Sequence, residues 1–101
     1  MKYQVGETLI IRSWEDMVSE YGLNEMGNID CPGEIVFASS MRHLCGQEFT
    51  IKNVRSHSYR DVDIYHSEEG IEDRYIITEY MMEPAFIKDV DIVEFENILA
   101  R

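Results

Sequence analysis

The stretch ASSMRHLCGQEFTIKNVRSHSYRDVDIY, residues 38–65, decides the fold that this sequence predicts. A short apolar turn ends at Gly46 and leads directly into the segment at 49–52, FTIK. In that segment apolar and polar side chains alternate, which is typical of a half-buried β-strand. We therefore expect this strand to anchor the sheet and its apolar residues to point into the core.

Two further strands are expected after this one. Val54 breaks the alternation, so a β-bulge is predicted near Asn53. A polar turn follows, residues 59–65 return as a second strand, and residues 71–77 form a third. Three adjacent strands joined by short turns predict an antiparallel meander.

The N-terminal part predicts a strand followed by a short helix. Residues 8–12 are rich in β-branched side chains, which favour a strand. Ser13 is placed to cap a helix over residues 14–21, where apolar residues recur at helical spacing, and Gly22 is placed to end it.

The remaining segments are shorter. Residues 23–33 are predicted as a loop and residues 34–37 as a short strand. Thr78 begins a single helical turn that Pro84 stops, and residues 91–99 favour a terminal helix. Together these elements predict a mainly β domain with short helices.

Length and composition predict a single domain with one core in a chain of 101 residues. No apolar run approaches the roughly 18 residues of a membrane span, and residues 1–7 lack the apolar region of a signal peptide. We therefore expect a cytoplasmic protein. In that reducing compartment Cys31 and Cys45 should remain thiols, with Cys31 exposed in a loop and Cys45 in the core.

The formal net charge is −11, and the acidity belongs to the second part of the chain. Residues 1–60 hold eight acidic and six basic residues, whereas residues 61–101 hold twelve and three. Such a field repels nucleic-acid phosphates and membrane surfaces but attracts a basic protein surface. We expect no direct binding of nucleic acid or membrane and a protein partner with a basic surface. The alternative is plain solvation, since small domains commonly carry a net charge of about 2–8.

Two groups of residues are candidates for partner binding. The first is an acidic surface formed by strand, turn and C-terminal residues. It comprises Asp61, Asp63, Glu68, Glu69, Glu72, Asp73, Asp89, Asp91, Glu94 and Glu96. The second is an aromatic groove for an extended peptide, with cover of the core as the alternative role. It comprises Trp14, Tyr59, Tyr65, Tyr75 and Tyr80.

No cofactor, metal or catalytic residue is expected. A structural zinc site needs four ligands in close pairs, and only His43 and Cys45 are close in sequence. A nucleophilic cysteine needs a histidine oriented by a third group, and no sequence signature supplies one. Asp61 and Asp63 alternate as solvent-facing strand residues do, so an enzyme is not expected. The enzymatic hypothesis requires a pocket that holds a titratable residue with a strongly perturbed pKa.

An ordered series of short motifs spans residues 1–84. It comprises Val5-Gly6-Glu7, Ser13-Trp14-Glu15, Tyr21-Gly22-Leu23, Ile29-Asp30-Cys31, Met41 with Leu44-Cys45-Gly46, Thr50-Ile51, and Thr78-Glu79 with Met81 and Glu83-Pro84. The series resembles a family of small SH3-like β-barrel proteins that recur in Firmicutes and in their phages and prophages. The family's closing strand carries a tryptophan, where this chain has Tyr75, Ile76 and Ile77.

The resemblance implies architecture and setting rather than an activity. The implied fold is an SH3-like small antiparallel barrel over residues 1–84, with an inserted N-terminal helix. Residues 85–101 depart from the family's pattern, and we expect them to form an acidic helical extension packed on the same domain. The setting implied is that of a phage or prophage protein.

These observations favour a non-enzymatic protein-binding module. The specific hypothesis is an inhibitor of a host nucleic-acid-handling defence protein, in which the acidic surface mimics nucleic acid. The alternative is a structural or homo-oligomeric accessory protein that dimerises through the 85–101 extension. Its contacts would be Phe86, Ile87, Phe95, Ile98 and Leu99.

Overall fold

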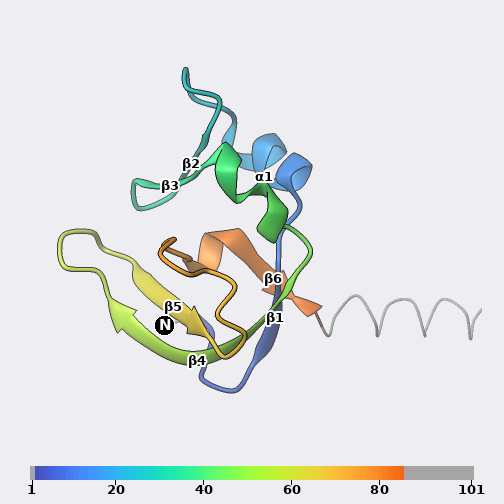
Figure 1. The fold of residues 1–101 in the computed structure, drawn as a ribbon. Helices are drawn as coiled ribbons and strands as arrows, with labels where there is room; N and C mark the ends of the chain where they lie inside the picture. Colours follow the sequence, from blue (N-terminus) through green and yellow to red (C-terminus); the bar gives the residue numbers. More distant parts are fainter. Residues whose placement is uncertain (1, 86–101) are drawn as a thin grey trace, which may run out of the picture.

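A four-stranded antiparallel sheet forms the centre of the fold in the computed structural model, which describes residues 2–85 (Figure 1). The strand order is β5-β4-β1-β6. The strands are β1 (Thr8–Ile11), β4 (Glu48–Ser56), β5 (Asp63–Ser67) and β6 (Met82–Pro84). A separate two-stranded sheet pairs β2 (Ile29–Cys31) with β3 (Ile35–Phe37). The protein is therefore mainly β, as the sequence predicts, while the helix expected at 91–99 lies outside the described residues.

The period-two pattern of the sequence places the core side of the sheet correctly. Phe49 and Ile51 of β4 are buried, and they pack in one core with Leu9 and Ile11 of β1. The register between β4 and β5 shifts between Ile51 and Asn53. The predicted bulge is therefore confirmed.

The predicted helix is also present. Helix α1 (Trp14–Tyr21) begins after Ser13, whose Oγ accepts a hydrogen bond from the backbone N–H of Asp16. It ends at Gly22, which has a φ of 78° and donates its N–H to the carbonyl of Val18. Such a left-handed backbone is the reason that glycine is favoured there.

The segment predicted as a loop at 23–33 contains a strand that the sequence does not reveal. Ile29 and Cys31 of β2 point inward opposite Phe37 and Ile35 of β3. A strand of three residues is too short to show a period of two. Its partner β3 supplies the pairing that stabilises it.

The exposed position expected for Cys31 is wrong, whereas Cys45 packs against the core as a partly buried side chain. Cys31 is buried in the hairpin, and burial raises its pKa to about 11. Cys45 is half-buried. Both are free thiols, as predicted. Cys31 is buried because the unpredicted strand β2 carries it into the core.

The third strand predicted at 71–77 is wrong. This segment forms turns, and within it only Ile77 makes a β-bridge, to Tyr65. The carboxylate of Glu72 is buried and accepts hydrogen bonds from the backbone N–H and the hydroxyl of Ser67. Because this side chain bonds to the backbone of β5, it replaces strand pairing in that place.

The last part of the described chain returns to the first strand. The predicted turn after Thr78 is the 3₁₀ helix η2 (Glu79–Met81), and another 3₁₀ helix, η1 (Ser39–Leu44), precedes β4. Strand β6 follows η2 directly and pairs with β1. This strand was not predicted because Pro84 argues against pairing, but a proline is tolerated on an edge strand. Among residues 2–85 no helix has the length and apolar character to cross a membrane.

Candidate functional site

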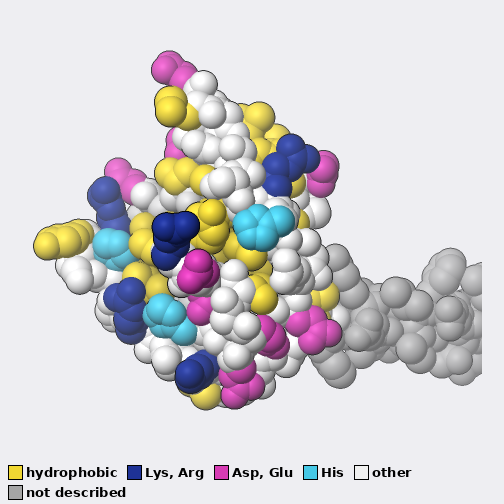
Figure 2. All heavy atoms as spheres, in the orientation of Figure 1, with side chains coloured by type: hydrophobic (Ala, Val, Ile, Leu, Met, Phe, Trp, Pro, Cys, Tyr) yellow, Lys and Arg dark blue, Asp and Glu magenta, His cyan; other side chains and the backbone are white. Residues whose placement is uncertain are grey.

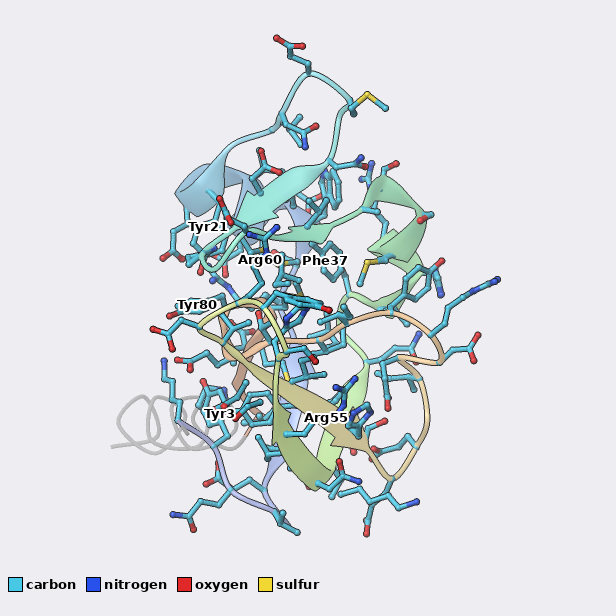
Figure 3. The ribbon with its side chains drawn as sticks, turned by 90° about the vertical axis from the view of Figure 1, so that its left-hand side faces the viewer. Tyr3, Tyr21, Phe37, Arg55, Arg60 and Tyr80 are labelled. Atoms are coloured by element: carbon cyan, nitrogen blue, oxygen red, sulfur yellow. The ribbon has the colours of Figure 1, made fainter. Side chains whose placement is uncertain are left out.

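A hollow of about 400 Å³ opens between the start of the chain, α1, η2 and β6, and we call it the tyrosine hollow. Tyr3, Tyr21 and Tyr80 line it from three separate segments. In Figure 3 these three tyrosines lie along one edge of the molecule. The other lining residues are Lys2, Arg12, Asp16, Glu20, Glu79, Met82, Glu83 and Pro84.

Arg12 holds the elements around this hollow in place. Its Nε donates to Asp16 at 2.8 Å and its Nη2 donates to Glu20 at 2.6 Å, both on α1. Its Nη1 donates to the Tyr21 hydroxyl at 2.9 Å and to the backbone carbonyl of Tyr80 at 3.0 Å. One planar side chain therefore joins the end of β1 to α1 and to η2.

The charge of Arg12 is fully committed to these partners. Burial lowers its pKa, but the hydrogen bonds to Asp16 and Glu20 outweigh this effect and hold the pKa above its ordinary value. The guanidinium carbon also lies 5.3 Å from the centre of the Tyr21 ring. Arg12 is thus a structural cation of the hollow rather than one offered to a ligand.

Tyr3 is fixed by the core beneath it. The hydroxyl of the buried Tyr65 accepts the backbone N–H groups of Lys2 and Tyr3, and the rings of Tyr3 and Tyr65 meet edge to face at 6.2 Å. Burial raises the pKa of Tyr3, and the negative charges of Glu79 and Glu7 raise it further. The raised pKa therefore reflects mainly the burial of Tyr3, with a smaller contribution from these carboxylates.

The lining of the tyrosine hollow suits a cation. Four carboxylates face two basic side chains in it, and two of the four already bond to Arg12. Tyrosine rings attract cations through their negative faces, and carboxylates accept hydrogen bonds from them. Lys2 and Arg12 already lie over the rings of Tyr3 and Tyr21, at 5.4 and 5.3 Å from the ring centres, which shows that these rings bind cations within the protein itself. The volume falls within the range of about 300–1,000 Å³ that ligand sites occupy.

A second hollow of about 290 Å³ adjoins the first at the tip of the β4–β5 hairpin, and we call it the hairpin hollow. Glu79 and Tyr80 line both hollows, so η2 forms the wall between them. The other lining residues are Ser56, His57, Arg60, Asp61, Val62 and Asp63.

The tips of the two hairpins are packed together beside the hairpin hollow. Gly33, with a φ of 82°, lies so close to Val62 that a Cβ atom on it would be 2.1 Å from Cγ1 of Val62. Next to this contact Arg60 forms an ion pair with Glu34. The β2–β3 turn therefore supports the wall of the hairpin hollow from behind.

The five residues of the predicted aromatic groove do not lie together. Only Tyr80 lines the two hollows. Tyr65 is fully buried, as the alternative role in the core predicts, and Tyr59 is 91% exposed near the hairpin tip. Trp14 lies against Phe37 and under Arg42, while Tyr75 contacts His43 edge to face. Tyr3 and Tyr21 join Tyr80 instead.

The predicted acidic residues also divide into groups. Asp61 and Asp63 line the hairpin hollow. Glu68, Glu69 and Asp73 are exposed in the segment after β5, where Glu69 accepts hydrogen bonds from Thr50. Four of the predicted residues lie outside the described residues, namely Asp89, Asp91, Glu94 and Glu96.

Glu72 corrects the acidic surface that the sequence predicts. It is only 5% exposed, and both its oxygens face Ser67. Its carboxylate therefore serves the fold, and a partner cannot contact it while the fold is intact. The surface has to be drawn without it.

Basic and histidine side chains gather over β4, β5 and the segment that follows them, with acidic side chains among them (Figure 2). Arg55 donates to Nε2 of His66 at 3.1 Å, and Nδ1 of His66 lies 3.7 Å from Glu72. This face is mixed in charge. The predicted continuous acidic band is therefore interrupted on it, and the concentrated carboxylates lie in the hollows.

Among residues 2–85 no three histidine, cysteine or acidic side chains are grouped so that they could hold a metal ion. His57, which lines the hairpin hollow, uses Nδ1 to accept the backbone N–H groups of Tyr59 and Arg60.

Comparison of the whole chain with protein-family models, with curated proteins and with solved structures finds no match. Its function has to be argued from the hollows and their charges.

Proposed function

We propose that the protein is a non-enzymatic binding module that captures a cationic segment of a partner protein in the tyrosine hollow. The observation that carries this proposal is the meeting of three tyrosines and four carboxylates in one concave site. Tyrosine is enriched at protein interfaces, where a rigid ring supplies contact area and a hydroxyl supplies a hydrogen bond.

The proposal keeps the expected basic partner and changes the surface that binds it. A protein that handles nucleic acid presents arginine and lysine side chains, which are the chemistry that the hollow suits. An inhibitor of such a protein remains the proposed role in a phage or prophage setting. The dimer alternative depends on residues outside the described part of the chain.

The proposed scaffold is an SH3-like barrel. The order of elements supports it, because a short 3₁₀ helix precedes the last described strand, which pairs back with the first. A bridge between Tyr65 and Ile77 joins the turn segment to β5 on the other side of the sheet. In such a scaffold the tyrosine hollow lies where the two ends of the sheet approach each other.

Selection of peptides tests this function. A random peptide library is displayed and selected on the wild-type protein, and the enriched peptides are then measured against Tyr80→Ala and Glu83→Gln. We expect enriched peptides to be rich in arginine and lysine and to lose at least about tenfold in affinity for Tyr80→Ala, as interface tyrosines do. Circular dichroism confirms that the variants fold.

The matched control is Glu25→Gln, which removes one negative charge from an exposed residue that lines neither hollow. It should bind the selected peptides as the wild type does. Enrichment of neutral or acidic peptides, or equal binding to Tyr80→Ala, contradicts the proposed function.

A further inference from the structure

We infer that the tyrosine hollow and the hairpin hollow act as one groove, which takes an extended segment carrying two cationic side chains, one on each side of Tyr80. This inference rests on the proposed function and deepens it. It assigns the hairpin hollow as a second subsite and specifies how many positions separate the two cationic side chains of the ligand.

The two hollows share a wall. Glu79 and Tyr80 line both hollows, so a ligand that fills one hollow contacts the border of the other. Figure 3 shows Arg60, which lines the hairpin hollow, close to Tyr80. The two subsites are therefore neighbours across η2.

Hydrogen bonds hold the wall between the two hollows in place. The backbone carbonyl of Tyr80 accepts hydrogen bonds from Arg12 and from the Tyr21 hydroxyl, at 3.0 and 3.3 Å. Since β1 and α1 hold these donors, the position of Tyr80 is set before any ligand arrives. A preorganised ridge between two hollows favours one spacing of ligand side chains over others.

Acidic side chains predominate in the lining of the hairpin hollow. Asp61, Asp63 and Glu79 supply three carboxylates. Of the two basic residues there, Arg60 is paired with Glu34. The Nδ1 atom of His57 accepts the backbone N–H groups of Tyr59 and Arg60, so this atom is engaged within its own turn. The hollow therefore favours a cation, as the tyrosine hollow does.

The geometry of an extended ligand determines which of its side chains face the groove. In an extended chain, alternate side chains point to the same side, about 7 Å apart. Two cationic side chains lie on the same side of an extended ligand when they are two or four positions apart. A spacing of three positions turns one of them away from the groove. The inference thus distinguishes ligands that have the same composition and charge.

The test uses synthetic nine-residue peptides of glycine and serine that carry arginine. Three peptides contain two arginines, at spacings of two, three or four positions, and a fourth contains one arginine. Each is titrated into the ¹⁵N-labelled protein, and affinity is measured from the movement of backbone NMR signals. We expect the peptide with a spacing of two or four to bind about fivefold more tightly than the peptide with a spacing of three.

The subsite is tested by the double variant Asp61→Asn/Asp63→Asn. It should bind the best two-arginine peptide no more tightly than the wild type binds the one-arginine peptide. The control Glu68→Gln/Asp73→Asn removes the same charge from exposed residues outside both hollows, and it should change affinity less than twofold. Circular dichroism checks that both variants fold, because Asp63 lies in β5.

Equal affinity at all three spacings, or an unchanged affinity in Asp61→Asn/Asp63→Asn, overturns the second subsite. If the one-arginine peptide still shifts the Tyr80 signal in that case, the proposed function of the tyrosine hollow stands alone. If no arginine peptide moves any signal, the second subsite and the proposed function both fail.

Discussion

Arg12 and Glu72 are both buried charged side chains, yet they organise the molecule over different distances. Arg12 bonds across the fold, to α1 and to the carbonyl of Tyr80, which is 68 residues away in sequence. Glu72 bonds to Ser67, five residues away. The first charge therefore places the elements of the candidate site, whereas the second shapes a single turn.

The comparison shows why burial alone does not identify a functional residue. Removing a buried charge leaves the groups that were hydrogen-bonded to it without a partner. Which parts of the structure are then disturbed depends on the elements that carry those groups. The partners of Arg12 surround the tyrosine hollow. The partners of Glu72 are the backbone N–H and the hydroxyl of Ser67 in β5. The predictions below separate these two kinds of effect.

Arg12→Met should have the largest effect. The change removes hydrogen bonds to α1 and η2 and should lower the free energy of unfolding by about 3 kcal/mol. Because Asp16 and Glu20 are about half exposed, water can solvate them, which keeps the loss at the lower end of the range for buried pairs. Urea unfolding measures the loss, and NMR should show movement in both α1 and η2.

The matched variant is Arg12→Lys, which keeps the charge but not the planar fork. It should recover part of the stability and fail to restore the position of Tyr80, since one ammonium cannot reach every partner. A loss below about 1 kcal/mol in Arg12→Met contradicts the role given to this residue.

Glu72→Ala should have a smaller and local effect. It leaves the N–H and hydroxyl of the buried Ser67 without their acceptor, at a cost of about 2 kcal/mol. Glu72→Gln retains an acceptor oxygen and should cost less. Hydrogen exchange should accelerate at Ser67 and Gly70, whereas Tyr80 keeps its wild-type rate. Acceleration at η2 contradicts the local role.

Thr78→Val tests a buried polar side chain that, unlike Arg12 and Glu72, carries no charge. Thr78 is fully buried, and its hydroxyl has no hydrogen-bond partner among the described residues. Replacing an unsatisfied hydroxyl by a methyl group should leave stability unchanged or raise it by up to about 1 kcal/mol. The urea midpoint measures this, and Thr78→Ala, which leaves a cavity, should be less stable than Thr78→Val. A marked loss in Thr78→Val contradicts this account of the site.

Glu69→Gln should have the smallest effect, seen as a change in pH dependence. Partial burial raises the pKa of Glu69, but hydrogen bonds from the N–H and hydroxyl of Thr50 outweigh this and leave the pKa below its ordinary value of 4.5. A lowered pKa in the folded state stabilises the fold above the unfolded pKa, and this contribution disappears as pH falls through the folded value. The stability difference between wild type and variant should therefore shrink below about pH 4.5. A constant difference contradicts it.

Local sequence patterns predict the elements whose signals lie within one segment. The capping of α1 by Ser13, the alternation in β4 and the bulge near Asn53 are confirmed. Strand β2 is missed because its three residues are too few to show a period of two. Strand β6 is missed because it contains Pro84 and pairs with β1, at the other end of the described chain. The third strand was predicted wrongly because a hydrogen-bonded carboxylate, Glu72, looks in sequence like a solvent-facing acid.

The candidate site is harder to predict than the fold. Tyr80 is among the residues of the predicted aromatic groove, but Tyr3 and Tyr21 are not, because only the tertiary structure brings the three together. One signal was available: Arg12 is a charged residue at the end of a predicted buried strand, next to a helix that carries acids at helical spacing. Such a residue can be expected to pair with that helix.

Trp14 offers a built-in optical reporter on the fold. It is the single tryptophan of the chain, and its ring lies against Phe37 while the guanidinium of Arg42 covers its face at 4.9 Å. Its emission therefore senses the joint between α1, β3 and η1. Selective excitation of this tryptophan can follow one defined part of a small molecule without any label.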